Sequence, residues 1–281
     1  VMPITTNMFF DFAIFSFFIF IIQIILPIKQ KENILYKILL ITLIVAQIFC
    51  IKAAWNVTIL RMAQGIDHPA FLFRIREFFT VFPALGSYNP WWNAGTEHFI
   101  GVTSGSHSFA FLMAPFLILF PIEYAHSFAI LFWMIVGFPW LTVITFKRAG
   151  MRHIASIMGG IAMFAFTRSE FLFFWQSGNL GGMVTAMLAP SITALGYRIV
   201  VQRKGNILDI ILIIICAWLS CIWTPGVFTC IGLLIGAIWN YRRFNKKTFR
   251  QCILIATITL LLLSPWLWTT FFPARGIVDY V

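Results

Sequence analysis

The sequence predicts an all-α protein, a polytopic transmembrane bundle of about eight spanning helices, and three observations lead to this prediction. Of its 281 residues, 60% are hydrophobic and only 10% are charged, whereas a soluble domain carries roughly 25% charged residues. The apolar residues form repeated runs of the length that crosses a bilayer. These runs are continuous, whereas the strands of an outer-membrane barrel alternate apolar and polar residues. The three observations exclude a water-soluble fold and favour helices in lipid.

Eight apolar runs each approach the roughly 20 residues that span about 30 Å of hydrocarbon. They cover residues 8–28, 34–54, 125–147, 152–168, 182–202, 207–223, 226–241 and 251–271. The first run lacks a basic leader and a small-residue cleavage site, so we expect a retained helix and not a signal peptide. We expect residues 1–281 to form a single transmembrane domain.

A ninth apolar stretch, residues 109–122, is shorter than the others and contains two prolines. The positive-inside rule decides whether it crosses, because short cytoplasmic loops collect Lys and Arg. If it does not cross, 14 of the 20 Lys and Arg residues share one side. If it crosses, the basic clusters at 29–37 and 147–152 fall on opposite sides. We therefore predict that 109–122 is re-entrant or interfacial and that residues 55–124 form an outer-face loop.

The formal net charge of +11 would suggest nucleic acid as a partner if the protein were soluble. Here the basic residues lie in short loops between apolar runs, where they set the topology, so we expect no nucleic-acid partner. The five cysteines lie within or beside apolar runs and lack the spacing of metal ligands. We interpret them as apolar packing residues and expect no metal site. The sequence leaves a requirement for a divalent cation open.

The predicted outer loop interleaves charged and aromatic side chains. This pattern suits short amphipathic helices in the interface, with polar groups facing a cavity that is apolar below and polar above. Such a cavity fits a substrate that is part lipid and part headgroup. The polar members are Arg61, Asp67, His68, Arg74, Arg76, Glu77, Glu97 and His98, and the aromatic members include Phe71, Phe73, Tyr88, Trp91 and Trp92.

The order of segments along the chain carries a resemblance. A spanning helix is followed by G-I-D-H-P-A-F-L-F-R, by G-S-Y-N-P-W-W-N-A-G and by a short apolar helix containing proline. The pattern continues through K-R-A-G-M-R-H, a small-residue run, G-N-L-G-G and a helix with Pro190, and covers residues 34–204. In this order the chain resembles the GT-C superfamily of integral-membrane glycosyltransferases, in particular its YfhO-like bacterial members.

The resemblance implies transfer of a sugar from a polyprenyl-phosphate donor to an acceptor on the outer face, with the donor and membrane lipids as partners. It makes Asp67 the catalytic base, because a carboxylate can accept the proton of the attacking acceptor hydroxyl. Arg61, Arg74 and Arg76 would compensate the charge of the departing phosphate. Glu170 matches the region of a second acidic residue in related families. The expected substrate-binding set is completed by His68, Trp91, Trp92 and Glu97.

These residues also have structural interpretations. Asp67 could cap a helix that begins near the following proline. Arg74 and Arg76 could extend to lipid headgroups, and the two tryptophans could be interfacial anchors. Glu170 could form an ion pair with the neighbouring arginine.

Two other functions compete with transfer. A lipid-carrier transporter or flippase would need ionisable residues in the middle of spanning helices or paired discontinuous helices related by a repeat, and the middles of the predicted spans lack Asp, Glu, Lys and Arg. A noncatalytic membrane subunit is the third alternative, because family members usually carry further helices and a soluble C-terminal domain that we expect to be missing here. We expect a multi-pass protein of the bacterial inner membrane. The sequence leaves the sugar, the acceptor and the oligomeric state open.

Overall fold

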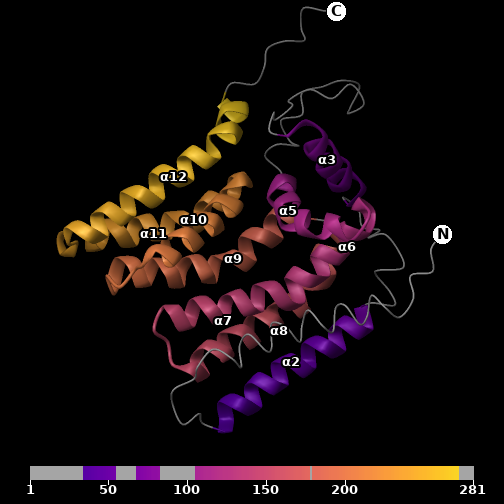
Figure 1. Ribbon diagram of the computed structural model, residues 1–281, viewed down its shortest axis with the longest axis horizontal. Coiled ribbons are helices and arrows are strands. Elements are labelled where there is room, and N and C mark those ends of the chain that lie inside the picture. The colour runs from indigo at the N-terminus through magenta and orange to yellow at the C-terminus, as the bar shows by residue number, and fades with distance from the viewer. Residues whose placement is uncertain (1–33, 55–67, 83–104, 178, 272–281) are drawn as a thin grey trace, which may run out of the picture.

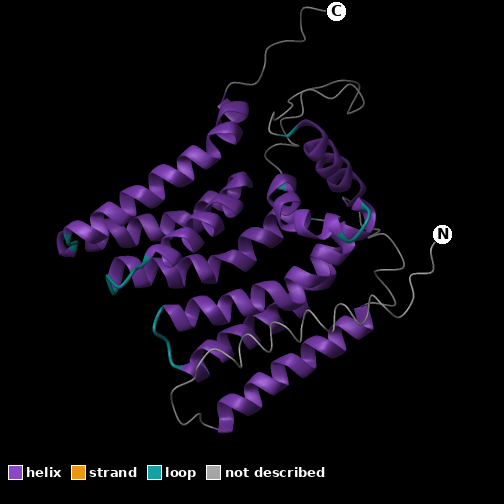
Figure 2. Ribbon diagram, in the orientation of Figure 1, coloured by secondary structure: helices purple, strands orange, loops and turns teal. Residues whose placement is uncertain are grey.

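The computed structural model describes residues 34–54, 68–82, 105–177 and 179–271. In these parts of the chain every regular element is a helix, as Figure 2 shows, which confirms the predicted all-α class. The spanning helix expected at 8–28 lies outside the described residues.

From α5 onward the helices follow one another along the chain with short connections. The first part comprises α2 (Ile34–Ala54), α3 (His68–Val81), α5 (Ser106–Met113) and the 3-10 turn η3 (Ala114–Ile118). The middle part comprises α6 (Ile122–Phe132), the π turn η4 (Trp133–Gly137), α7 (Phe138–Arg148), α8 (His153–Ser177), α9 (Leu180–Gly196) and the π turn η5 (Tyr197–Val201). The last part comprises α10 (Ile207–Ile222), η6 (Thr224–Gly226), α11 (Val227–Asn240), η7 (Tyr241–Arg243) and α12 (Lys246–Phe271).

Four helices of the described chain are long and apolar enough to cross a membrane. They are Ile34–Lys52, Ile122–Arg148, Leu180–Val201 and Lys246–Trp268. Shorter apolar helices cover Ser106–Ile118, His153–Phe166, Ile207–Ile222 and Thr224–Asn240. Three of these shorter helices coincide with spans predicted from the sequence, at 152–168, 207–223 and 226–241. The described chain is therefore an all-helical bundle with four candidate membrane spans, compatible with a membrane protein, and the total of eight spans stays a prediction.

Two helix boundaries differ from the sequence prediction. The sequence predicts that a helix ends at 168, but α8 continues to Ser177, because no glycine or proline interrupts residues 161–177. The sequence also predicts a helix start at 251, but α12 begins at Lys246. Asn245 accepts a hydrogen bond from the backbone N–H of Thr248 at 2.8 Å and caps this start. In both cases the helix extends beyond the apolar run.

The helices lie side by side, so the chain reverses direction at two ends of the bundle (Figure 1). The basic end holds the α7–α8 connection, the segment between η5 and α10, and η7. The start of α2 lies there too, because Lys147 Nζ donates a hydrogen bond to the Tyr36 hydroxyl at 2.9 Å. The described basic residues of this end include Lys37, Lys147, Arg148, Arg152, Arg198, Arg203, Lys204, Arg242, Lys246, Lys247 and Arg250.

The opposite end, the α3 end, holds α3, α5, η3 and the starts of α6 and α9 (Figure 1). Gly105 precedes α5 with a φ of 79°, and a Cβ there would lie 2.4 Å from Gly181 Cα in α9. Only glycine allows this backbone conformation together with so close an approach. α5 and η3 have 8 and 5 residues, too few to cross a bilayer at about 1.5 Å per residue. The described segment 109–122 therefore lies at one end of the bundle, and its predicted re-entrant or interfacial position stays a prediction.

The outer faces of several helices are apolar. α11 has no buried residue in this structure, and Phe228 and Trp239 on it are 74% and 86% exposed. Leu260 and Leu261 of α12 are also exposed. The core instead forms where α5, α6, α7 and α9 meet, around Phe109. Apolar side chains that face outward suit a hydrocarbon solvent and not water.

Candidate functional site

The candidate site is the α3 end, and α3 is the helix on which it is built. The residues of α3 with buried side chains are His68, Phe71, Arg74, Ile75 and Phe78. Their spacing of three and four residues places them on one face of the helix. Arg76 and Thr80 are exposed on another face. α3 is therefore the amphipathic helix that the outer-loop pattern predicts.

Five of the predicted site residues lie outside the described residues. They are Arg61, Asp67, Trp91, Trp92 and Glu97. The described members on α3 are His68, Arg74 and Arg76. Because the predicted span ends at 168, Glu170 was expected in the outer loop that follows it, and this is wrong because its backbone belongs to α8. The same absence of helix-breaking residues that extends α8 to Ser177 carries Glu170 into the helix.

The two arginines of α3 have different surroundings. Arg74 is 8% exposed, and its guanidinium carbon lies 5.3 Å from the centre of the Phe71 ring, a cation–π distance. Arg76 forms an ion pair with Glu123 in the first turn of α6, and the two side chains are 60% and 36% exposed. Residues two apart on a helix point about 200° away from each other. Arg76 therefore joins α3 to α6, and Arg74 is the arginine that faces the interior.

Histidines from three helices meet at this end. His68, the first residue of α3, is 1% exposed, and its ring lies edge-on to that of His126 in α6, with 5.2 Å between ring centroids. His107 in α5 lies 4.6 Å from the Phe78 ring. The Trp266 indole N–H of α12 donates to His107 Nδ1 at 3.1 Å. α3, α5, α6 and α12 thus contribute to one buried layer of aromatic and imidazole rings.

His126 is the least satisfied member of this layer. Its side chain is 1% exposed, and neither ring nitrogen has a hydrogen-bond partner among the described residues. A buried polar group without a partner costs free energy, on the order of 1–3 kcal/mol from protein data. The sequence pattern does not select His107 or His126 as site residues. His107 contacts Phe78 of α3 and Trp266 of α12, and His126 contacts His68 of α3. Because these contacts come from other helices, no local sequence pattern marks either histidine.

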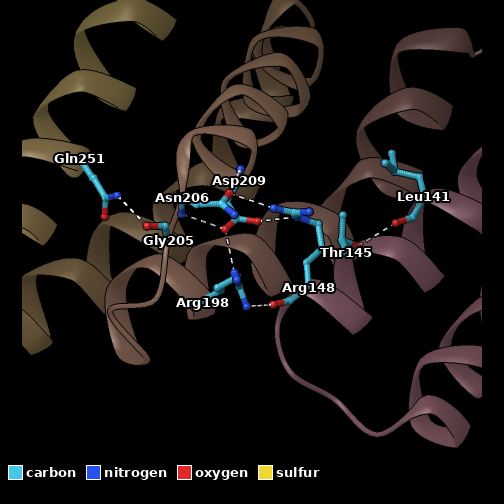
Figure 3. A network of polar contacts seen from close by, with 8 residues as sticks. All are labelled: Leu141, Thr145, Arg148, Arg198, Gly205, Asn206, Asp209 and Gln251. Atoms are coloured by element: carbon cyan, nitrogen blue, oxygen red, sulfur yellow. Dashed lines mark hydrogen bonds and ion pairs between the residues drawn. The ribbon is translucent and has the colours of Figure 1, made fainter. Parts of the chain in front are cut away.

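The basic end holds a polar network of a different kind, which Figure 3 shows at close range. Asp209, fully buried in the first turn of α10, accepts hydrogen bonds from Arg148 Nε at 2.6 Å and from Arg198 Nε at 2.7 Å. Arg148 also donates to the Asn206 side chain at 2.9 Å. Asn206 and Asp209 form a reciprocal capping box at the start of α10. Each carboxylate oxygen is paired, so the network joins α7, η5 and α10.

The network continues into the neighbouring loops. Gln202 donates to the backbone oxygen of Ala149 at 2.6 Å, and Gln251 of α12 donates to that of Gly205 at 2.9 Å. Thr145 donates back to the Leu141 carbonyl in the preceding turn at 2.9 Å, as Figure 3 shows. These hydrogen bonds hold the loops of the basic end in place. The buried Asp209 carboxylate is occupied by structural contacts.

The described residues contain no group of three or more His, Cys, Asp or Glu side chains placed to hold a metal ion. Comparison of the chain with protein-family models, with curated proteins and with solved structures finds no match. The assignment of a site therefore rests on the geometry of the two ends.

Proposed function

We propose that the protein is a membrane glycosyltransferase of the GT-C type. It transfers a sugar from a polyprenyl-phosphate-linked donor to an acceptor on the outer face of the membrane. The observation that carries this proposal is the position of α3. This amphipathic helix starts directly after Asp67 in the sequence and turns His68 and Arg74 toward the interior, at the end of the bundle opposite the basic end.

The roles follow from the chemistry of the groups. In this proposal Asp67 accepts the proton of the acceptor hydroxyl as it attacks the anomeric carbon. Arg74 compensates the charge that develops on the departing polyprenyl phosphate, since a guanidinium suits phosphate contact. The aromatic layer formed with Phe78 and Trp266 excludes water from the base of the site. The location that agrees with the positive-inside rule has the basic end in the cytoplasm, and we propose the bacterial inner membrane.

The test is an assay of donor cleavage. The purified chain is incubated in nanodiscs with a panel of undecaprenyl-phosphate-linked hexoses, and release of undecaprenyl phosphate is measured. This product appears whether the sugar goes to an acceptor or to water. We expect release with at least one sugar, and a loss of at least a hundredfold in Asp67→Asn, because general base catalysis contributes roughly 10²–10⁴ in rate.

The controls separate chemistry from folding and from transport. Asp279→Asn makes the same chemical change at another acidic position predicted on the outer side, and it should retain release. Asp67→Asn should unfold at the wild-type temperature, whereas loss of folding would indicate that Asp67 is only a helix cap. Movement of labelled undecaprenyl phosphate between leaflets without cleavage by the wild type would contradict the proposal and favour a flippase.

A further inference from the structure

Two thiols meet where α10 and α11 are joined. Cys221 lies one residue before the end of α10 and Cys230 lies in the first turn of α11, with η6 between them. Their Sγ atoms are 3.5 Å apart, and both side chains are partly exposed. The two residues are nine apart in the sequence, so the contact depends on the geometry of the turn.

The turn between the two helices is held closely in place. A Cβ on Gly226 would lie 1.8 Å from the Ser220 carbonyl oxygen, so the chain passes there at a distance that only glycine allows. The Gly226 N–H donates to the Trp223 carbonyl at 2.7 Å. The Thr185 hydroxyl of α9 donates to the Ser220 carbonyl at 3.2 Å. These bonds fix the two helix ends to each other and to α9.

The residues directly before the two cysteines are also in contact. Ser220 Oγ and Thr229 Oγ1 are 3.1 Å apart, and Thr229 also donates to the Gly226 carbonyl at 2.6 Å. The two helices therefore face each other at two successive positions, first with hydroxyls and then with thiols. A disulfide has an S–S length of about 2.05 Å. The sulfurs need to approach by only about 1.5 Å, within the range of side-chain rotation.

We propose that Cys221 and Cys230 are a redox-active pair that forms a disulfide across the α10–α11 turn. The oxidant is a small-molecule disulfide. The thiolate of one cysteine attacks the oxidant, forms a mixed disulfide and releases one thiol. The thiolate of the second cysteine then attacks the Sγ atom of the first cysteine in this mixed disulfide and releases the second small thiol. Two protein thiols and one oxidant disulfide become one protein disulfide and two small thiols, so protons and electrons balance.

The pair lies at the α3 end, where Gly105 packs against Trp223 of the same turn. In the proposed topology this end faces outward, and disulfides persist in oxidising compartments outside the cytoplasm. The bond would fix the turn that supports the start of α5. The chemistry of the pair does not depend on the sugar-transfer reaction, so each proposal can fail separately.

The experiment counts thiols before and after oxidation. The full chain, purified in detergent under reducing conditions, has five cysteines. Alkylation with a maleimide after unfolding in SDS, which exposes the buried Cys216, should label all of them. After incubation with glutathione disulfide we expect two thiols fewer. Chymotrypsin can cleave between the cysteines, after Trp223 or Phe228. Mass spectrometry without reductant should then find the fragments of Cys221 and Cys230 joined, and separated after reduction.

Matched cysteine-to-serine variants test whether the disulfide joins Cys221 to Cys230. Cys252→Ser, in α12, should lose one label and still form the bond. Cys221→Ser should leave Cys230 as a stable adduct with glutathione. Five labelled thiols in the oxidised wild type would overturn the proposal. A disulfide that uses Cys216, or glutathione adducts on both Cys221 and Cys230, would also overturn it. Because the wild type alone gives these readouts, a variant that fails to fold does not obscure the answer.

Discussion

The two ends of the bundle use their polar side chains in opposite ways. At the basic end, Asp209 is fully buried and each of its carboxylate oxygens accepts a hydrogen bond from an arginine. At the α3 end, His68, His107 and His126 are buried among aromatic rings, and the nitrogens of His126 lack partners among the described residues. The buried charge at the basic end is neutralised within the fold, although Thr248 Oγ1 and Gln251 Oε1 there lack partners among the described residues. The buried imidazoles at the α3 end lie instead among aromatic rings, and one of them has no partner at either nitrogen within the described part of the chain.

This difference separates structure from function. The Asp209 carboxylate accepts three hydrogen bonds within the fold and is fully buried, so little of its capacity is left for a ligand. A buried polar group without a partner costs stability, and proteins retain such groups chiefly where a ligand or a reaction uses them. The comparison gives the basic end a structural role and leaves the α3 end as the place of the proposed activity.

The largest effect is expected from Asp209→Ala at the basic end. Removing the carboxylate leaves Arg148 and Arg198 facing each other and removes half of the capping box of α10. Breaking a buried ion pair on one side costs about 3–5 kcal/mol. The arginine side chains are 23% and 21% exposed and can turn toward water, so we expect a loss of about 3 kcal/mol. Equilibrium unfolding in mixed detergent micelles measures it.

Asn206→Ala is the graded control for this prediction. It removes the reciprocal cap and the contact with Arg148 but leaves both ion pairs of Asp209. We expect a loss of about 1 kcal/mol, the usual cost of a helix cap. Equal losses in the two variants would mean that the ion pairs contribute nothing beyond the cap, and the contrast between the two ends would disappear.

A smaller effect is expected from Trp266→Phe at the α3 end. This change removes the hydrogen bond from the indole N–H to His107 Nδ1 and part of a buried ring. We expect a loss of about 1–2 kcal/mol in unfolding free energy. Trp268→Phe, two residues further along α12, is the matched control because its side chain is 64% exposed. Similar losses in both variants would argue against a specific layer between α12 and α5.

The helical class could be predicted from the sequence because hydrophobicity acts locally along the chain. The span predicted at 34–54 coincides with α2. Helix ends were less predictable. α8 and α12 extend beyond their apolar runs, because a helix continues through polar residues until a cap or a breaker stops it.

The site was only partly predictable, because its contacts join distant parts of the chain. The outer-loop pattern selected His68, Arg74 and Arg76, all of which lie on α3. It did not distinguish the buried Arg74 from the exposed Arg76, since this depends on which face of α3 packs against the bundle. His107 and Trp266 are 159 residues apart in the sequence, so no local pattern could pair them. The predicted base, Asp67, lies outside the described residues and stays a prediction.

The smallest effect on stability is expected from His126→Leu. Unlike the variants above, it should raise the free energy of unfolding or leave it unchanged. Leucine is similar in size to histidine and removes two buried nitrogens that have no partner among the described residues, so the desolvation cost disappears while packing is largely kept. We expect unfolding free energy to be unchanged or higher by up to about 1 kcal/mol, and release of undecaprenyl phosphate to fall. The thermal unfolding midpoint and the donor-cleavage assay measure the two effects.

His153→Leu is the matched control at the basic end, where the histidine ring lies edge-on to Tyr36 with 5.6 Å between centroids. His153 is exposed, so the substitution should leave both stability and donor cleavage near the wild-type values. If His126→Leu lost more than about 2 kcal/mol, the nitrogens of His126 would be hydrogen-bonded in the folded protein. His126 would then resemble Asp209 in being structural. Higher stability together with lower activity would instead show that the α3 end gives up stability for function.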